Sequence, residues 1–520
     1  MDPIVATLSI LVLAIIAFVS NRISLGVVAI GVSLALYFTG VLTLEESLAG
    51  FGNPTVLFIA GLFVVSESLD ATGVTAWAGQ KVIGRAGTNP TVLIVVIGVL
   101  VALVSAIISI NGATAALLPL VVVVAARAGI ASSQLLMPLA FAASAGSMLL
   151  LTGTPVNIIV SQFAADAGGR EFSFFEFAAV GIPLVIGTVL LLVLFARRLL
   201  PERVGAIMPM DLVNHARMLR SNYALSLETG VILGPSSGVT EVVVGPRSPL
   251  IGERVTPGMK TPAGDLVVLA VKRGDTLLKS QDIETQVGDI LLLQGAWDDL
   301  ARHSHEPGVM VVDAPEQLRR SIPLGRGAKR TLVVLAAMVV LLATGLVPPA
   351  VAALLAAGAL VVTRTISPPQ AYRSISWTTI VLIAGMMPLS TAFIETGTAD
   401  LVAGWLLDLL GGASPHLALL VLVVITVVLS QLISNTATVL IVAPIAISVA
   451  ATMGVSILPF MMALTVAGAA AFLTPIATPA NLMVMEPGGY KFGDYWKLGT
   501  PLTLFFIVMA VLYVPLIWPF

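Results

Sequence analysis

Short polar motifs interrupt the apolar stretches of this sequence at four places. Two are turns rich in hydroxyl and amide side chains, at 105–114 and 430–438, and two are Thr-Pro motifs, at 153–157 and 477–481. Where such a motif breaks a helix, freed backbone carbonyls can join side-chain oxygens around a cation such as sodium. Unpaired N–H groups at helix N-termini instead suit an anion. No convergent nucleophile, base or metal-binding set accompanies these motifs, which disfavours an enzyme.

The four motifs form two pairs, one member of each pair in each half of the chain. Gly-Thr-Pro-Val-Asn at 153–157 becomes Ala-Thr-Pro-Ala-Asn 324 residues later, whereas the serines of the turns recur at a shift of 325. Asn111 and Asn435 match at 324, so the sequence leaves open which residues are equivalent there. One motif alone fits a proline kink or close helix packing. Recurrence in both halves favours the central binding site of a transporter.

The composition restricts the chain to the membrane class. Hydrophobic residues make up 58% and charged residues 10% of the 520 residues, against about 25% charged in a typical soluble domain. The mean hydropathy is +1.03. A net charge of −2 gives no reason to expect a nucleic-acid partner, and the absence of cysteine excludes disulfides and thiolate metal sites.

Apolar runs predict an all-α polytopic membrane protein. The first membrane half, residues 1–200, has runs at 4–20, 25–42, 55–69, 91–109, 113–126, 134–163 and 175–194. The second membrane half, residues 327–520, has runs at 331–346, 349–363, 378–393, 416–433, 438–450, 458–484 and 501–518. We expect the long runs at 134–163 and 458–484 to be broken at their Thr-Pro motifs.

The paired runs around each polar turn predict a re-entrant hairpin, because they are shorter or more interrupted than full spans. Each half then crosses the membrane five times, which gives two inverted repeats. Basic loop residues support this count, since they stay on the cytoplasmic side. With the N-terminus outside, the cytoplasmic loops hold Arg22, Lys81, Arg85, Arg197, Arg198, Lys329, Arg330, Arg364, Arg373, Lys491 and Lys497. In the outside loops the only basic residue is Arg170. We therefore expect an inner (plasma) membrane protein whose central domain is cytoplasmic.

The central segment, residues 201–326, is predicted to be a small cytoplasmic α/β domain with linkers. Strand-like runs lie at 239–244, 266–272 and 289–294, and a helix is expected near Ala296. The segment resembles the TrkA-C (RCK-C) regulatory domain through Ser-Pro-Leu-Ile-Gly at 248–252, the run at 268–274 and the run at 287–295. The resemblance implies a sensor or dimerisation module, and it leaves open whether the domain binds a ligand or only forms a dimer.

The membrane motifs resemble those of the divalent anion:sodium symporter family. Ser-Asn-Thr at 434–436 and the Thr-Pro motifs at 153–157 and 477–481 carry the match, which extends over about 1–198 and 325–520. The resemblance implies sodium-driven uptake of a dicarboxylate, tricarboxylate or sulfate-like anion by a homodimer embedded in lipid. At the first turn the sequence departs from the family, with Ser-Ile-Asn where the family has Ser-Asn-Thr.

The resemblance also assigns site residues. It places one sodium among Ser105, Ser109, Asn111 and Gly153, and a second among Ser430, Asn435 and Ala477, which Ser434 completes. The same likeness turns Asn111, Thr154, Asn435, Thr436 and Thr478 toward the anion. The other motif residues that we expect at the substrate are Thr114, Pro155, Asn157, Thr438, Pro479 and Asn481. Since no Arg or Lys lies in these motifs, a co-bound cation would supply the counter-charge.

Two alternatives remain open on the sequence. One is a proton-coupled antiporter or oxyanion exporter of the same superfamily, in which Glu67 or Asp70 would relay protons. The other is a channel regulated by the central domain. A channel should carry polar residues along a whole path, whereas this chain concentrates them at the four motifs.

Overall fold

The structure is a computed structural model. It describes residues 2–20, 22–83, 87–203, 219, 223, 237–261, 264–274, 276–278, 282–303, 309–312, 324–325, 327–409 and 414–520. The chain divides into two compact units. The helical unit comprises Met1–Glu67, Val82–Met208 and Val333–Phe520, and the other unit comprises Ser68–Lys81 and Pro209–Leu332.

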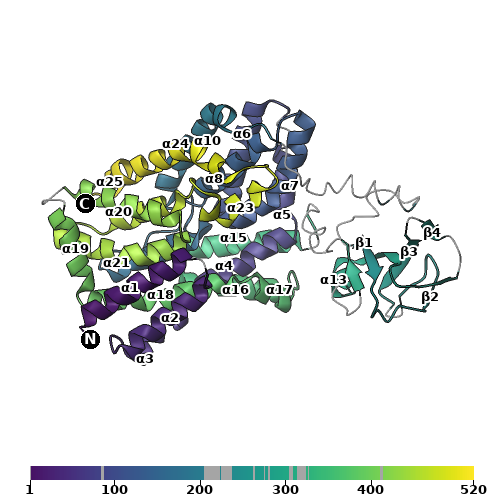
Figure 1. Cartoon of the computed structure of the whole chain (residues 1–520), viewed down its shortest axis with the longest axis horizontal. Coiled ribbons are helices and arrows are strands. Elements are labelled where there is room, and N and C mark those ends of the chain that lie inside the picture. The colour runs from purple at the N-terminus through teal and green to yellow at the C-terminus, as the bar shows by residue number, and fades with distance from the viewer. Residues whose placement is uncertain are drawn as a thin grey trace. The chain divides into compact units, whose positions relative to one another are not determined.

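The described part of the chain is mostly helical (Figure 1). The first membrane half contains α1 Pro3–Ser20, α2 Leu25–Phe38, α3 Leu44–Leu48, α4 Pro54–Ala71, α5 Val74–Ile83, α6 Pro90–Ile107, α7 Ile110–Ala128, α8 Ser133–Gly146, α9 Pro155–Asp166 and α10 Ala178–Leu199. The second contains α15 Ala328–Thr344, α16 Pro349–Val362, α17 Pro368–Ser374, α18 Trp377–Glu395, α19 Thr398–Leu409, α20 Pro415–Ser430, α21 Asn435–Met453, α22 Leu458–Ala469, α23 Pro479–Met485, α24 Tyr495–Val508 and α25 Val514–Ile517.

Helix starts recur between the halves as the motifs do. Thus α2 begins at residue 25 and α16 at 349, while α7 begins at 110 and α21 at 435. The helix ends recur too, because α7 and α21 both stop at a left-handed glycine, Gly129 and Gly454. The inverted relation of the halves in a membrane stays a prediction.

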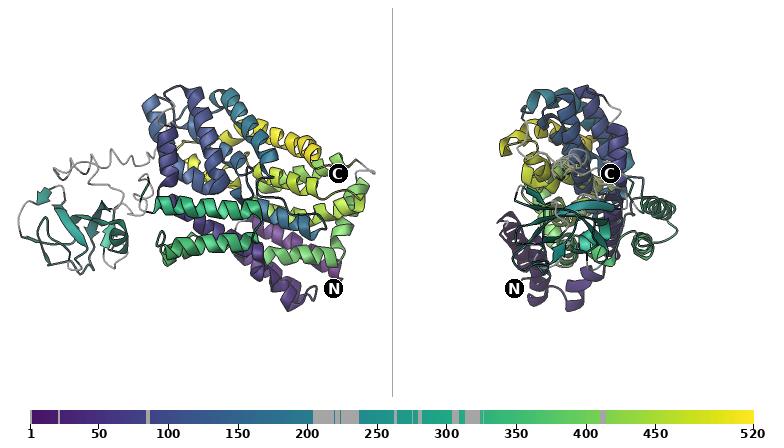
Figure 2. Two further views of the ribbon diagram at one scale, coloured as in Figure 1. Left: turned by 180° about the vertical axis from the view of Figure 1, so that it is seen from behind. Right: turned by 90° about the vertical axis from the view of Figure 1, so that its right-hand side faces the viewer.

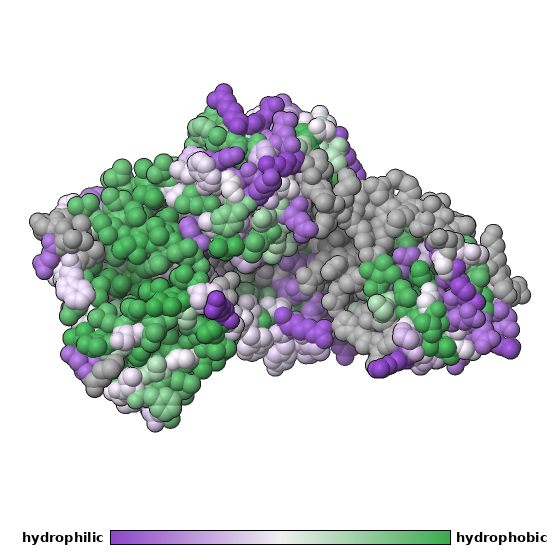
Figure 3. All heavy atoms as spheres, viewed as in Figure 1, coloured by the Kyte–Doolittle hydropathy of each residue, from purple (hydrophilic) through white to green (hydrophobic). Residues whose placement is uncertain are grey.

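Surface composition fits a lipid environment. Eight helical stretches of the described residues are long and apolar enough to cross a membrane. Large apolar side chains stand exposed on them, for example Leu13 (64%) and Ile186 (63%). A broad hydrophobic face covers much of the helical unit in the view of Figure 3. Such a face would be costly in water and is typical of a membrane protein.

Three sequence expectations about the motifs need correction. The helices of the first pair, α6 and α7, have 18 and 19 residues and are therefore not shorter than full spans, so length does not support re-entrance. The polar turn is also shorter than expected, because only Ile108 and Ser109 separate the two helices. The broken segment, in contrast, is interrupted over a longer stretch than 152–155, since α8 already ends at Gly146.

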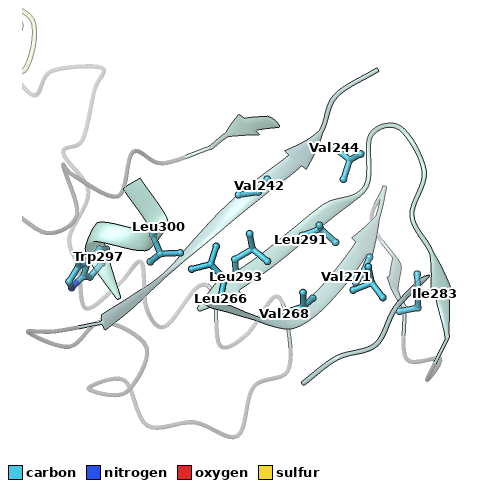
Figure 4. Close-up of a cluster of buried hydrophobic side chains, with 11 residues drawn as sticks. Val242, Val244, Leu266, Val268, Val271, Ile283, Leu291, Leu293, Trp297 and Leu300 are labelled. Atoms are coloured by element: carbon cyan, nitrogen blue, oxygen red, sulfur yellow. The ribbon is translucent and has the colours of Figure 1, made fainter. Parts of the chain in front are cut away.

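The second unit contains the predicted strands. They are β1 Ser237–Val244, β3 Leu266–Arg273 and β6 Ile290–Ala296, joined by β4 Thr276–Leu278 and β7 Val309–Val311 in the order β4-β3-β6-β1-β7. These strands pair in an antiparallel manner, and β2 Arg254–Val255 pairs separately with β5 Ile283–Glu284, also antiparallel. The expected helix is α13, Trp297–His303. Figure 4 shows its Trp297 and Leu300 beside the buried sheet residues that form one core.

Candidate ion and substrate site

The first helix break is held open by Asn157, which is fully buried. Its amide nitrogen Nδ2 donates to the carbonyl oxygens of Ser147 at 3.0 Å and Leu150 at 2.9 Å. In a continuous helix these carbonyls would accept from backbone N–H groups four residues later. The Asn157 side chain thus binds two carbonyls inside the break, and the Leu150 carbonyl also accepts from the Gly153 N–H at 3.1 Å. These contacts stabilise the interruption that begins where α8 ends at Gly146.

The second break repeats this arrangement. Asn481, 1% exposed, donates from Nδ2 to the carbonyl oxygens of Ala471 at 2.9 Å and Thr474 at 3.1 Å. In both halves the acceptors lie 10 and 7 residues before the asparagine. The two motifs therefore perform the same structural task.

The remaining amide oxygens, Oδ1 of Asn157 and Oδ1 of Asn481, are buried and receive no hydrogen bond from the residues that the structure describes. Both amide hydrogens of each side chain face backbone carbonyls, so the free group must be the acceptor. Leaving a buried acceptor unsatisfied costs about 1–3 kcal/mol. A cation or a hydrogen-bond donor would satisfy these oxygens, whereas an anionic oxygen would be repelled. Of the two expected ligand types, they therefore suit the cation.

Threonine and proline fix the helix that follows each break. Thr154 is the N-cap of α9 and Thr478 the N-cap of α23, both in extended conformation. The Thr154 hydroxyl accepts from the Val156 N–H, and the Thr478 hydroxyl accepts from the Asn481 N–H. Pro155 and Pro479 follow at the first helical position, where a missing N–H costs nothing.

Gly153 makes the first break tighter than the second. A Cβ atom on Gly153 would lie 2.1 Å from the Ser147 carbonyl oxygen, which also accepts from Asn157. The second half has Ala477 at this position, and its Cβ is accommodated. Gly153 is required here because the backbone of the break folds against itself.

Each turn is connected to the break of its own half. In the first half, Ser105 donates to the Ala143 carbonyl at 2.7 Å, and Thr152 donates to the Ala106 carbonyl at 3.2 Å. In the second half, the side chain of Gln431 makes part of the contact between turn and break. Its Nε2 donates to the Ala470 carbonyl at 3.2 Å, and its Oε1 accepts from the Leu473 N–H at 3.0 Å.

A further threonine completes the second connection. Thr474 donates to the Gln431 carbonyl at 3.3 Å, as Thr152 does to Ala106. Thr152, Thr474 and Gln431 were not among the site residues expected from the sequence. The two threonines lie within the breaks but precede the Thr-Pro motifs at 153–157 and 477–481. Gln431 has Ala106 as its counterpart at the shift of 325, so the repeat gave no signal for it.

The N-terminal ends of α7 and α21, the helices that follow the two polar turns, show which residues are equivalent to the two asparagines. Ser109 is the N-cap of α7 and accepts from the Gly112 N–H, and Ser434 is the N-cap of α21 and accepts from the Ala437 N–H. Asn435 is therefore the first residue of its helix and corresponds to Ile110. Asn111 is the second residue of its helix and corresponds to Thr436.

The hydroxyls and amides of the turns have different surroundings. Thr114 donates to the Ile110 carbonyl at 2.8 Å, and Ser430 donates to the Val427 carbonyl at 2.9 Å. Thr438 Oγ1 and Asn435 Oδ1, in contrast, are buried with no hydrogen-bond partner among the described residues. Asn111 is exposed, while Asn435 and Thr436 are half-buried.

The two halves interleave around these motifs. Helix α9 follows the first break and packs against α21 and α22. Helix α23 follows the second break and packs against α7 and α8 (Figure 1). Gly468, near the end of α22, marks one meeting point. A Cβ there would lie 3.4 Å from the Val439 side chain of α21 and 3.8 Å from that of Val156 in α9. The start of α9 thus lies beside the second turn and the second break.

The last long helices also join the halves, since α24 packs against α10 (Figure 2). At one end Arg203, which follows α10, pairs with Asp494 at 2.7 Å, just before α24. At the other, Trp518, which follows α25, donates to Glu176 at 2.7 Å, just before α10. Glu176 in the first half is thus bound by a residue that follows the last helix of the second half. Asp494 in the second half is bound by a residue that follows the last helix of the first.

Comparison with known proteins agrees with a transporter. The sequence matches the citrate transporter family (CitMHS) over residues 15–467 and 410–520. The uncharacterized transporter YfbS of Escherichia coli is 32% identical over 99% of both chains. The probable sodium/sulfate cotransporter 3 of Chlamydomonas reinhardtii is 28% identical over 52% of this chain and 31% of its own length.

Among solved structures, the YdaH transporter of Alcanivorax borkumensis has a TM-score of 0.50 at 14% identity, with 99% of this chain and 98% of that chain covered. At this identity the likeness concerns the fold alone. The family matched is that of the citrate transporters, whereas the motifs had suggested the divalent anion:sodium symporters. Because the family match spans most of the sequence and a full-length relative exceeds 30% identity, the chain belongs to the citrate transporter family and is a membrane transporter.

Proposed function

We propose that this transporter is a sodium-coupled symporter of a small anion with two or more negative charges, such as sulfate, a dicarboxylate or citrate. The observation that carries the proposal is the pair of unpaired, buried amide oxygens on Asn157 and Asn481, one at each helix break. They offer negative partial charge inside the helical unit, where a cation would find oxygen ligands and little competing water.

Charge balance supports the coupling of the two solutes. The turns and breaks contain no Arg or Lys in residues 105–119, 147–157, 430–444 and 470–481. A doubly negative solute brought into low dielectric without a counter-charge faces a large desolvation penalty. Bound sodium lowers that penalty, and the positive end of the α9 helix dipole at Thr154 lowers it further. The anion and the cation would then bind better together than either binds alone.

The names of two groups of relatives support this substrate class. The matched family is described as citrate transporters, and several distant relatives from Chlamydomonas reinhardtii are named sodium/sulfate cotransporters. Citrate and sulfate are both oxyanions of high charge density. Hydroxyls, amides and helix N-termini bind either, so the choice between them rests on the size of the site.

Orientation and assembly complete the proposal. We place the N-terminus outside an inner (plasma) membrane, with residues 201–326 in the cytoplasm, because basic loop residues then gather on the inner side. The two halves, 1–200 and 327–520, would form inverted repeats with re-entrant hairpins that alternate access to the site. We further propose a homodimer, in which the TrkA-C-like domain regulates the rate or stabilises the pair.

Uptake into proteoliposomes tests the function. Purified protein would be reconstituted and supplied with radiolabelled sulfate, a C4-dicarboxylate or citrate, under imposed sodium, potassium or proton gradients. The proposal predicts saturable uptake of at least one anion that requires inward sodium and does not respond to potassium. Uptake that follows the proton gradient and ignores sodium would contradict it.

A further inference from the structure

We infer that the two turns are not equivalent. The second turn, with the second break, holds the coupling cation, whereas the first turn lacks this site and presents Asn111 to the anion. This inference rests on the proposed sodium coupling and goes beyond it, because the repeat and the resemblance both suggest two similar sodium sites.

A one-residue offset between the asparagines is the first argument. With Ser109 and Ser434 as equivalent N-caps, Asn435 is the first residue of α21 and Asn111 the second residue of α7. One residue along a helix turns the side chain by about 100°. The two amides therefore leave their helices in different directions, and their environments differ accordingly, half-buried for Asn435 and exposed for Asn111.

The second turn carries a group of unpaired oxygens. Oδ1 of Asn435 and Oγ1 of Thr438 are buried without a hydrogen-bond partner among the described residues, and Thr438 is 0% exposed. Residues three apart on a helix lie on one face, about 5–6 Å between Cβ atoms. The break of the same half adds the unpaired Oδ1 of Asn481, and Thr474 connects the two regions by accepting from Asn481 and donating to Gln431.

The corresponding positions of the first turn have no such oxygens. Ile110 stands where Asn435 stands, and Ala113 stands where Thr438 stands. The side chains of Ile110 and Ala113 carry no oxygen that could bind a cation. In the described part of the first half, the unpaired buried oxygen among the predicted site residues is that of Asn157. One amide oxygen is a poor cation site, while three such oxygens with nearby carbonyls approach the ligand number of a hard cation.

The exposed position of Asn111 suits the other solute. Its amide can donate two hydrogen bonds, which an anion accepts and a cation does not. Its counterpart Thr436 offers one hydroxyl from the second turn. The first half would thus contribute more hydrogen bonds to the anion than the second half does. The cation would bind in the second half.

Sodium-dependent thermal unfolding of the purified protein tests this without transport. The probe is sodium chloride, with choline chloride at matched ionic strength. Because ligand binding stabilises by mass action, the slope of stability against the logarithm of sodium concentration counts the ions bound. For the wild type, we expect this slope to correspond to the binding of one sodium ion. Thr438→Val should weaken the apparent sodium affinity at least tenfold. The same substitution at Thr114, the threonine of the first turn, should leave that affinity unchanged.

Asn111→Ala and Asn435→Ala complete the test. We expect Asn111→Ala to keep the sodium response and to lose stabilisation by the transported anion, and Asn435→Ala to lose the sodium response. A wild-type slope for two ions, or equal loss of the sodium response in both variants, would overturn the inference while leaving sodium coupling intact. No sodium stabilisation in the wild type, with or without anion, would instead refute the proposed function itself.

Discussion

Asn157 and Asn481 stand at equivalent points of the two breaks and make the same pair of hydrogen bonds to carbonyls 10 and 7 residues earlier. Each side chain uses both amide hydrogens to bind carbonyl oxygens inside the break, where the helical hydrogen-bond pattern is interrupted. Each retains a buried oxygen that no described residue satisfies. The same residue therefore holds the helix open and offers a ligand at the opening.

Replacing Asn157 by aspartate tests the first of these roles. The variant keeps the shape and the oxygen but removes both donors, and it sets a carboxylate against two carbonyl oxygens. We expect a loss of about 1–3 kcal/mol in unfolding free energy, measured by thermal unfolding in detergent. Asn89→Asp is the matched control, because Asn89 caps α6 through its oxygen and aspartate caps equally well. Equal stability of the two variants would contradict the assigned role.

Gly153→Ala should damage the first break. The added methyl would lie 2.1 Å from the Ser147 carbonyl oxygen, so the break must move. We expect loss of uptake and a destabilisation of about 1–3 kcal/mol. The converse change, Ala477→Gly, should preserve uptake, since it only removes a methyl group. If both variants transport like the wild type, Gly153 is not needed for the close approach.

Glu176 should make stability depend on pH in the acid range. Burial alone would raise the pKa of Glu176, but hydrogen bonds from Arg170, the Ser173 N–H and Trp518 together lower it from 4.5 to about 2. The stabilisation is therefore present above the unfolded-state value and is lost as pH falls from 4.5 toward 2.

The variant Glu176→Gln removes this effect. At pH 6 it should be less stable than the wild type by about 1 kcal/mol, and the difference should shrink as the pH falls to 3. Thermal unfolding over this range measures it. A difference that stays constant with pH would show that the charge of Glu176 is not what stabilises the contact.

Glu67→Gln distinguishes the symporter from a proton-coupled antiporter. Glu67 Oε1 accepts from the side-chain amide of Gln370 at 3.1 Å, a contact that a glutamine can retain after an amide flip. Under the proposed sodium coupling, uptake and its pH profile should remain within about twofold of the wild type, a change below about 0.5 kcal/mol. Loss of uptake together with loss of pH dependence would favour the antiporter.

Much of the architecture was predictable because its signals are local. Apolar runs with Asn-Pro or Ser-Pro at their starts predict α6 and α20, and alternating apolar residues predict β1, β3 and β6. Thr154 and Thr478 were identified through their motif, and both are helix N-caps.

The features that could not be predicted depend on contacts between residues that are farther apart in the sequence. The extent of the breaks follows from hydrogen bonds that Asn157 and Asn481 make to residues up to 10 positions earlier. The equivalence of the asparagines required the N-caps Ser109 and Ser434. The packing of α9 on α21 and α22 joins segments with no shared motif, so no pattern could reveal it.

If a cation and an anion bind together in this transporter, a gradient of one must drive the other, and reciprocal flux measures this. Proteoliposomes with equal sodium on both sides would receive an inward gradient of the transported anion, and radiolabelled sodium accumulation would be measured. The account predicts that the anion gradient drives sodium inward and that Asn435→Ala abolishes this. Sodium flux that is independent of the anion gradient would contradict it.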